Sequence, residues 1–129
     1  LAHDEVAVAA HFPRFADGTR TGFVESSRRS GDYALAGVAL AVRQDASQVH
    51  SVRAAFVSVT DVPDVLDLSE VCRGDAHDLD LDAVADAVAG HVTPQADIHA
   101  GADYRRALVI ELTRRLLTEL ARTDEGSTR

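Results

Sequence analysis

Six histidines are the first side chains that could bind a metal ion or act as a base, and their spacing supplies no paired ligands. They stand at positions 3, 11, 50, 77, 91 and 99 and form no HxxxH, HExxH or HxH pattern. Zinc sites usually draw closely spaced ligands from short segments. The sequence therefore predicts exposed or strand-edge histidines, and a metal site would need ligands that converge from distant segments.

The acidic run from Asp75 to Asp86 is a second candidate, because it loosely resembles a calcium loop. It lacks the central glycine and the closing bidentate glutamate that such loops use. Alternating Asp and Leu is more typical of the start of a helix, where an Asp side chain caps free backbone N–H groups. This run therefore predicts a helix N-terminus and not a calcium site.

No nucleophile stands in a recognisable catalytic set. Cys72 is the only cysteine, so neither an internal disulfide nor a CxxC site can form, and a buried thiol is predicted. Asp32 with Ser30, or Asp97 with His99, could make part of a triad. However, the sequence contains neither a GxSxG elbow nor a GxGxxG phosphate loop.

The stretch "SSRRSGDYALAGVAL", residues 26–40, places two adjacent arginines and a Ser-Gly-Asp turn before an almost uncharged apolar segment. One interpretation is a surface turn with two exposed arginines. The other is an electropositive loop whose guanidinium and backbone N–H groups face an anionic or electron-rich ligand. Spacing alone leaves both interpretations open.

Composition limits the class of protein. The 129 residues fit one domain, with 46% apolar and 26% charged residues. The net charge of −8 argues against nucleic acid or an anionic membrane as the main partner. No apolar run approaches the length of a membrane span, and a reducing cytoplasm is the expected location. The start at Leu1 suggests a fragment of a longer protein.

The first half of the chain has the alternating pattern of strands. Strands are predicted over His3–Pro13, Phe23–Arg28, Tyr33–Gln44 and Val49–Val59, with a turn at Ala16–Gly22. The third is apolar on both faces, which predicts a central or doubly covered strand. Short turns favour antiparallel pairing.

The second half has the pattern of helices. A short helix is predicted over Asp67–Cys72, a second from an N-cap at Asp80 or Asp82 to Ala89, and a long third from Ala102 to Ala121. The apolar face of the third is predicted to carry Tyr104, Leu108, Leu112, Leu116 and Leu120, widened by Val109 and Leu117.

Strands followed by helices predict an α+β fold, an antiparallel sheet of about three to four strands packed on about three helices. We expect one domain over residues 1–122, with strands in 1–62 and a helical layer in 63–122. Residues 123–129 are expected to form a polar tail.

Three segments together resemble the C-terminal domain of the FAD-binding medium subunit of molybdenum hydroxylases, the family of carbon monoxide dehydrogenase and xanthine dehydrogenase. "FVESSRRSGDYALAGVALAV" (Phe23–Val42) is similar to the family's Ser-Arg-Arg-x-x-Asp-aromatic-Ala step before a Gly-Val-Ala strand. "DEVAVAAHFP" (Asp4–Pro13) resembles the domain opening, and "ADYRRALVIELTRRLL" (Ala102–Leu117) the closing helix.

The resemblance implies that FAD is bound in the full-length subunit and that this fragment taken alone binds none. It implies two partners, a large subunit with the molybdenum cofactor and a small subunit with 2Fe–2S clusters, which pass electrons to the flavin and on to an acceptor. It also implies a flavin-side loop, to which we assign Val24, Arg28, Arg29, Gly31 and Asp32.

The sequence departs from the family at three places. Xanthine-dehydrogenase-like members carry an acid where Gly31 stands and a lysine where Val24 stands, which puts NAD as the acceptor in doubt. Of the family's Gly-rich stretch after the fourth strand, only Val59 and Pro63 remain. The alternative is a stand-alone interaction or dimerisation module that has the same fold and no flavin.

Overall fold

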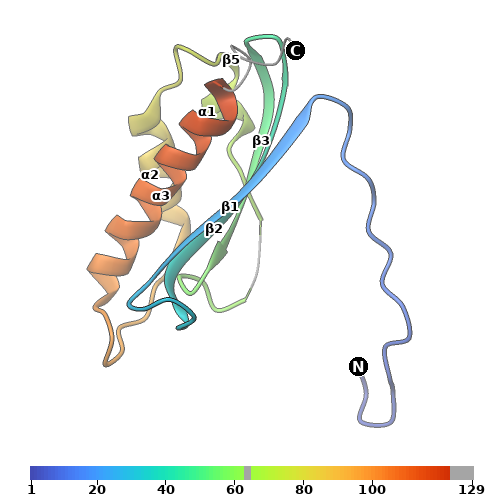
Figure 1. Cartoon of the computed structure of the whole chain (residues 1–129), viewed down its shortest axis with the longest axis vertical. Coiled ribbons are helices and arrows are strands. Elements are labelled where there is room, and N and C mark those ends of the chain that lie inside the picture. Colours follow the sequence, from blue (N-terminus) through green and yellow to red (C-terminus); the bar gives the residue numbers. More distant parts are fainter. Residues whose placement is uncertain (63–64, 123–129) are drawn as a thin grey trace.

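The computed structural model describes residues 1–62 and 65–122, which form an antiparallel sheet with helices on one face (Figure 1). The strands are β1 (Thr19–Ser27), β2 (Ala34–Asp45), β3 (Gln48–Val57), β4 (Val65–Asp67) and β5 (Gly74–Asp75). The helices are α1 (Ser69–Cys72), α2 (Leu81–His91) and α3 (Ala102–Arg122). The predicted α+β fold is confirmed, although β4 and β5 lie in the stretch expected to be helical. The predicted tail at 123–129 lies outside the described residues.

β2 is an interior strand between β1 and β3, in agreement with the central position that its doubly apolar pattern predicted. The sheet order is β1-β2-β3-β4, every pair is antiparallel, and β5 also pairs with β3. Because successive side chains of a strand point to opposite faces, every second residue of β2 faces the helices. Val38, Leu40 and Val42 are among those residues, and each is at most 2% exposed.

The prediction of a strand at residues 3–13 is wrong. No residue from 3 to 13 is in a strand, all are exposed, and this part of the chain extends away from the sheet (Figure 1). Alternation favours an extended segment, but a strand also needs a neighbour for its backbone hydrogen bonds. None of the described residues pairs with this segment. The turn expected at Ala16–Gly22 is also shorter, because β1 already begins at Thr19.

Strand β3 and helix α2 each end two residues away from the predicted position. β3 stops at Val57 and not at Val59, because Ser58 has a φ of 64°, in the left-handed region that interrupts an extended strand. Asp80 caps α2 as predicted, accepting from the backbone N–H groups of Asp82 and Ala83. The helix then passes through Gly90 to His91, instead of stopping at Ala89.

Helix α3 covers the sheet, but its buried face is rotated from the predicted one. Leu112 and Leu116 are buried as expected, whereas Tyr104 is 57% exposed and Arg105 only 5% exposed. The buried residues of α3 are Arg105, Val109, Leu112, Thr113, Leu116, Leu117 and Ala121. Hydropathy alone does not place an arginine on a buried helix face. The prediction therefore chose Tyr104 and not Arg105 as the buried residue of the first turn of α3.

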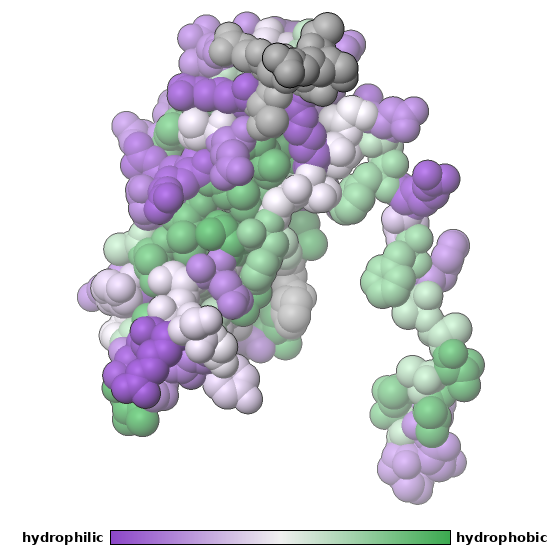
Figure 2. Space-filling model, viewed as in Figure 1, coloured by the Kyte–Doolittle hydropathy of each residue, from purple (hydrophilic) through white to green (hydrophobic). Residues whose placement is uncertain are grey.

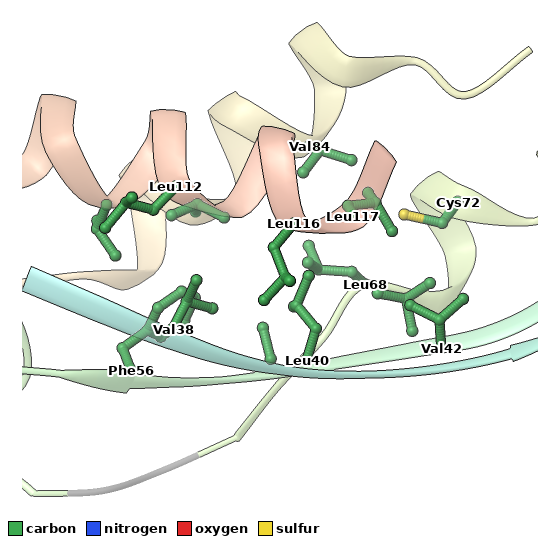
Figure 3. Close-up of a cluster of buried hydrophobic side chains, with 14 of the residues drawn as sticks. Val38, Leu40, Val42, Phe56, Leu68, Cys72, Val84, Leu112, Leu116 and Leu117 are labelled. Carbon is green, nitrogen blue, oxygen red and sulfur yellow. The ribbon is translucent and has the colours of Figure 1, made fainter. Parts of the chain in front are cut away.

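The core lies between β2 and β3 on one side and the three helices on the other (Figure 3). At Gly22 the helix comes so close that an added Cβ would lie 2.8 Å from Leu116 Cδ1. Cys72 is 1% exposed, which confirms the predicted buried thiol, and this burial raises the pKa of the thiol to about 11. None of the helices in the described part of the chain combines the length and apolarity of a membrane span.

Candidate functional site

The two arginines of the predicted flavin-side loop lie in a tight turn between β1 and β2. The carbonyl of Arg29 accepts from Ser27 Oγ at 2.8 Å and from the backbone N–H of Asp32 at 3.1 Å. Gly31 has a φ of 82°, and nothing lies within 4 Å of the position a Cβ would take. The turn therefore presents open backbone to whatever lies beside it.

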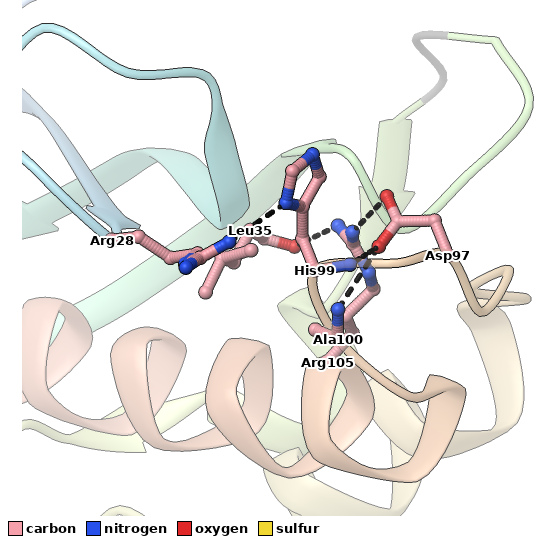
Figure 4. A network of polar contacts seen from close by, with 6 residues as sticks. All are labelled: Arg28, Leu35, Asp97, His99, Ala100 and Arg105. Atoms are coloured by element: carbon pink, nitrogen blue, oxygen red, sulfur yellow. Dashed lines mark hydrogen bonds and ion pairs between the residues drawn. The ribbon is translucent and has the colours of Figure 1, made fainter.

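Arg28 reaches across to the loop between α2 and α3. Its Nη1 lies 2.9 Å from Nδ1 of His99 (Figure 4). A guanidinium can only donate, so Nδ1 of His99 is the acceptor in this contact. Two loops that are 71 residues apart in sequence are thereby joined at one end of the sheet.

Asp97 organises the second loop. Its Oδ1 accepts from the backbone N–H groups of His99 at 2.8 Å and Ala100 at 2.9 Å, and its Oδ2 accepts from Arg105 at 2.6 Å. The N–H groups of Ala100 and His99, and then the Arg105 guanidinium, lower the pKa of Asp97 to about 2. The partial triad considered for Asp97 and His99 is not formed by these contacts, because Asp97 holds the backbone of His99.

Arg105 links this loop to the sheet. Its side chain is 6% exposed, and its Nη1 donates to the backbone carbonyl of Leu35 at 2.6 Å (Figure 4). Leu35 lies in β2 just after the arginine turn, so one side chain fixes the start of β2, the Asp97 loop and the first turn of α3. Buried arginines are normally paired in this way, because an unpaired buried charge is costly.

These loops surround a pocket of about 520 Å³. The β1–β2 turn supplies Arg28, Asp32 and Tyr33, the segment 58–61 after β3 forms a second wall, and His99 and Arg105 form part of a third. Tyr33 is 94% exposed. The pocket therefore combines an arginine, an exposed aromatic ring and an open backbone turn at one end of the sheet.

The structure brings together only part of the predicted site. Arg28 and Asp32 line the pocket, while Arg29 and Gly31 form the turn beside it. Val24 is different, because it packs from β1 against the core under α3.

Sequence reasoning missed His99 and Arg105 as parts of this site. The sequence did contain a signal for Arg105. It stands four residues before Val109, and residues four apart lie on the same face of a helix, which here is the buried face. Among residues 1–62 and 65–122, no three His, Cys, Asp or Glu side chains group so that they could hold a metal ion.

Asp97→Asn is expected to lower the urea midpoint at neutral pH. The folded-state pKa of Asp97 lies below its ordinary 3.8, so its contribution to stability is present above about pH 4 and disappears as pH falls through about 2. The urea midpoints of Asp97→Asn and of the original protein should therefore converge as the solution is acidified.

Asp103→Asn is the matched control, because Asp103 is fully exposed and its ion pair with Arg106 lies on the surface of α3. Its midpoint should stay close to that of the original protein throughout. If Asp97→Asn lowers the urea midpoint as much in acid as at neutral pH, the contacts assigned to the Asp97 carboxylate are contradicted.

Comparison with known proteins places this chain in a family. The family model described as "CO dehydrogenase flavoprotein C-terminal domain" matches residues 21–120. The nicotine 6-hydroxylase medium subunit of Paenarthrobacter nicotinovorans is 37% identical in an alignment of 126 residues that covers 92% of this chain and 42% of that protein. The carbon monoxide dehydrogenase medium chain of Hydrogenophaga pseudoflava is 31% identical in an alignment of 125 residues that covers 91% of this chain and 42% of that one.

Solved structures agree with the sequence comparison. A carbon monoxide dehydrogenase from Hydrogenophaga pseudoflava superposes with a TM-score of 0.67 at 29% identity, covering 80% of this chain and 37% of that chain. One from Oligotropha carboxidovorans, at 24% identity, shows the same fold with a TM-score of 0.73, over 86% of this chain and 40% of that chain. The chain spans about 42% of the length of the two medium subunits above. It belongs to the family of the CO dehydrogenase flavoprotein C-terminal domain.

Proposed function

We propose that this chain is the C-terminal domain of the FAD-binding medium subunit of a molybdenum hydroxylase. The family match carries the proposal, because residues 21–120 include the arginine turn, the Asp97 loop and Arg105, which together form the pocket. In the proposed complex, a molybdenum-cofactor large subunit and a 2Fe–2S small subunit deliver electrons to the flavin, which passes them to an acceptor. The alternative of a stand-alone module without flavin gains no support from the comparisons.

The residues around the pocket suit one edge of a flavin. Gly31 leaves the backbone of the turn open to close approach, and Tyr33 exposes an aromatic face beside it. The Arg28 guanidinium would stabilise negative charge that develops on the ring. Bound FAD would supply the redox chemistry, taking up electrons and releasing them to the acceptor.

The other residues act by holding Arg28. His99 accepts a hydrogen bond from its guanidinium, and Asp97 and Arg105 fix the loop that carries His99. Val24, which packs into the core, would support the turn from β1 without touching the ring. Because Gly31 replaces an acid of xanthine-dehydrogenase-like members in the turn beside the pocket, we propose an acceptor other than NAD.

We further propose that most of the FAD is held outside these 129 residues, so that the chain alone binds it weakly or not at all. A location in the cytoplasm stays a prediction.

Changing Arg28 and Arg29 together to alanine tests the proposed role of the turn. In the full-length subunit this double variant should slow electron transfer to the acceptor or lower the flavin reduction potential. A charge-assisted contact contributes on the order of 1–3 kcal/mol. The melting temperature of the 129-residue chain should change little, since both side chains are exposed. Potentiometric titration and thermal unfolding measure the two effects separately.

Arg114 and Arg115, a second pair of adjacent arginines, provide the matched control. They lie on α3, where Arg114 is 3.3 Å from Asp82 in a surface pair. Their double alanine variant should leave the flavin potential unchanged. If the Arg28 and Arg29 variant loses stability while its flavin chemistry stays intact, the arginines serve only to tie the loops together and the flavin-side role is wrong.

A further inference from the structure

The hydrogen bond between Arg28 and His99 depends on the protonation state of the histidine ring. Nη1 of Arg28 lies 2.9 Å from Nδ1 of His99 (Figure 4). A guanidinium carries donors only, so Nδ1 must offer a free lone pair and the proton of the neutral ring lies on Nε2. A second proton on the ring would occupy Nδ1 and set one N–H group against another. The contact therefore exists only while His99 is neutral.

A change in the pH of the solution reaches this contact without any opening of the fold. Histidine is the side chain that ordinarily changes its charge between about pH 5 and pH 8. Arg28 and His99 are both exposed. Figure 2 shows mainly hydrophilic residues at the lower end of the molecule, where the loop before α3 and the turn between β1 and β2 meet. Water can therefore exchange protons with the ring directly.

The surroundings of His99 give a protonated ring no compensating carboxylate. The charged and titratable residues that line the pocket with it are Arg28, Asp32, Tyr33, Asp61, Asp97 and Arg105. The carboxylate of Asp97 is engaged by Arg105 and by backbone N–H groups of its own loop. No carboxylate of the described residues forms an ion pair with the His99 ring. A protonated ring would therefore face the guanidinium as a like charge, and the two would repel each other.

The loops on both sides of the contact are held by groups that keep their charge over this pH range. Asp97 fixes the backbone of His99, and its pKa of about 2 leaves it ionised. Its partner Arg105 stays protonated. In the turn, the carbonyl of Arg29 accepts from Ser27 Oγ and from a backbone N–H, so no titrating group is involved. Protonation of His99 would thus break one contact and leave both loops in place.

We propose that His99 is a pH-dependent switch that holds Arg28 when the ring is neutral and releases it when the ring takes up a proton. The released guanidinium would stay within a pocket that also contains the carboxylates of Asp32 and Asp61. The switch itself needs no cofactor, whereas its consequence rests on the proposed function. If the pocket lies beside a flavin, the position of the positive charge next to the ring would depend on pH.

Carbon-13 relaxation of the Arg28 Cδ group in the 129-residue chain tests the switch. Between about pH 8 and about pH 5 its order parameter should fall by about a third or more, because the guanidinium loses its acceptor. His99→Asn keeps an acceptor oxygen near the position of Nδ1 and takes up no proton, so Arg28 should stay restrained throughout. His99→Lys carries a charge and no acceptor, so Arg28 should be mobile throughout.

His50→Asn is the matched control. His50 is exposed on β3 and does not line the pocket, so this variant should keep the pH response of the original protein. Equal restraint of Arg28 at both ends of the pH range would overturn the switch. A loss of restraint that persists in His99→Asn would show that a different group titrates, and would overturn it too.

The full-length subunit separates the switch from the proposed function. With FAD bound, the flavin potentials of the original protein and of His99→Asn should agree near pH 8 and differ near pH 5. Equal potentials at both pH values in a subunit that binds FAD would overturn the effect on the flavin and leave the proposed function standing. A full-length protein that takes up no FAD, with Arg28 released as expected, would support the switch and refute the proposed function.

Discussion

Replacing Leu116 by alanine is expected to lower the free energy of unfolding by about 2–5 kcal/mol. Leu116 is 7% exposed and packs from α3 onto β1, where Gly22 leaves room for its side chain. Shortening the side chain would leave a cavity, because the strand and the helix are each held by many other contacts and cannot simply close the gap. Urea denaturation of the 129-residue chain measures the loss as a lower midpoint at unchanged slope.

Ile98→Ala serves as the control for this change. Ile98 is also a large aliphatic residue, but it is 94% exposed in the loop before α3. Its removal should alter stability by no more than about 0.5 kcal/mol. Equal effects of the two substitutions would show that α3 is not docked on the sheet through Leu116.

The parts of the fold that could be predicted are those specified by local sequence. The hairpin between β2 and β3 follows from two apolar runs separated by a short polar turn. The start of α2 follows from Asp80, because a capping side chain acts on N–H groups only two and three residues away. Both features need no knowledge of distant residues.

The errors arose where a distant partner decides the structure. The segment from His3 to Pro13 alternates like a strand, yet nothing in the described chain pairs with it. The strand β4 has only three residues and exists because β3 offers it an edge, a pairing that no local pattern of this length can reveal.

The candidate site divides in the same way. The arginine turn was found because the residues of the family motif are contiguous in sequence. His99 was seen only as half of a triad, because its contact with Arg28 spans 71 positions. The burial of Arg105 depends on acceptors in β2 and in the Asp97 loop, so hydropathy places this arginine on the wrong side of the helix.

Arg105→Met is expected to destabilise the chain by on the order of 3 kcal/mol. Methionine keeps an unbranched apolar stem but cannot donate, so the change removes the charge-assisted hydrogen bonds to the Leu35 carbonyl and to Asp97. The Leu35 carbonyl would lose its charged donor in a buried position, which is the larger part of the expected cost. Without the guanidinium, the pKa of Asp97 should also rise from about 2.

Arg106→Met is the control for this variant. Arg106 is the next residue of α3, but its side chain is 38% exposed and its partner Asp103 lies at 3.4 Å on the surface. Such surface pairs contribute about 0–1 kcal/mol. Similar small losses for both variants would mean that Arg105 is not structurally important, despite its burial.

Hydrogen exchange then connects this stability effect to the site. The amides of His99 and Ala100 are bonded to Asp97, whose position depends on Arg105. They should exchange faster in Arg105→Met and unchanged in Arg106→Met. His99 in turn accepts a hydrogen bond from Arg28. The effect of removing Arg105 should therefore extend to the position of Arg28, although no residue of the arginine turn is changed. In the full-length subunit, Arg105→Met should therefore shift the flavin potential in the same direction as the Arg28 and Arg29 double variant, and by less. A shift of the potential in the opposite direction would show that Arg105 does not act on the flavin through the proposed flavin-side loop.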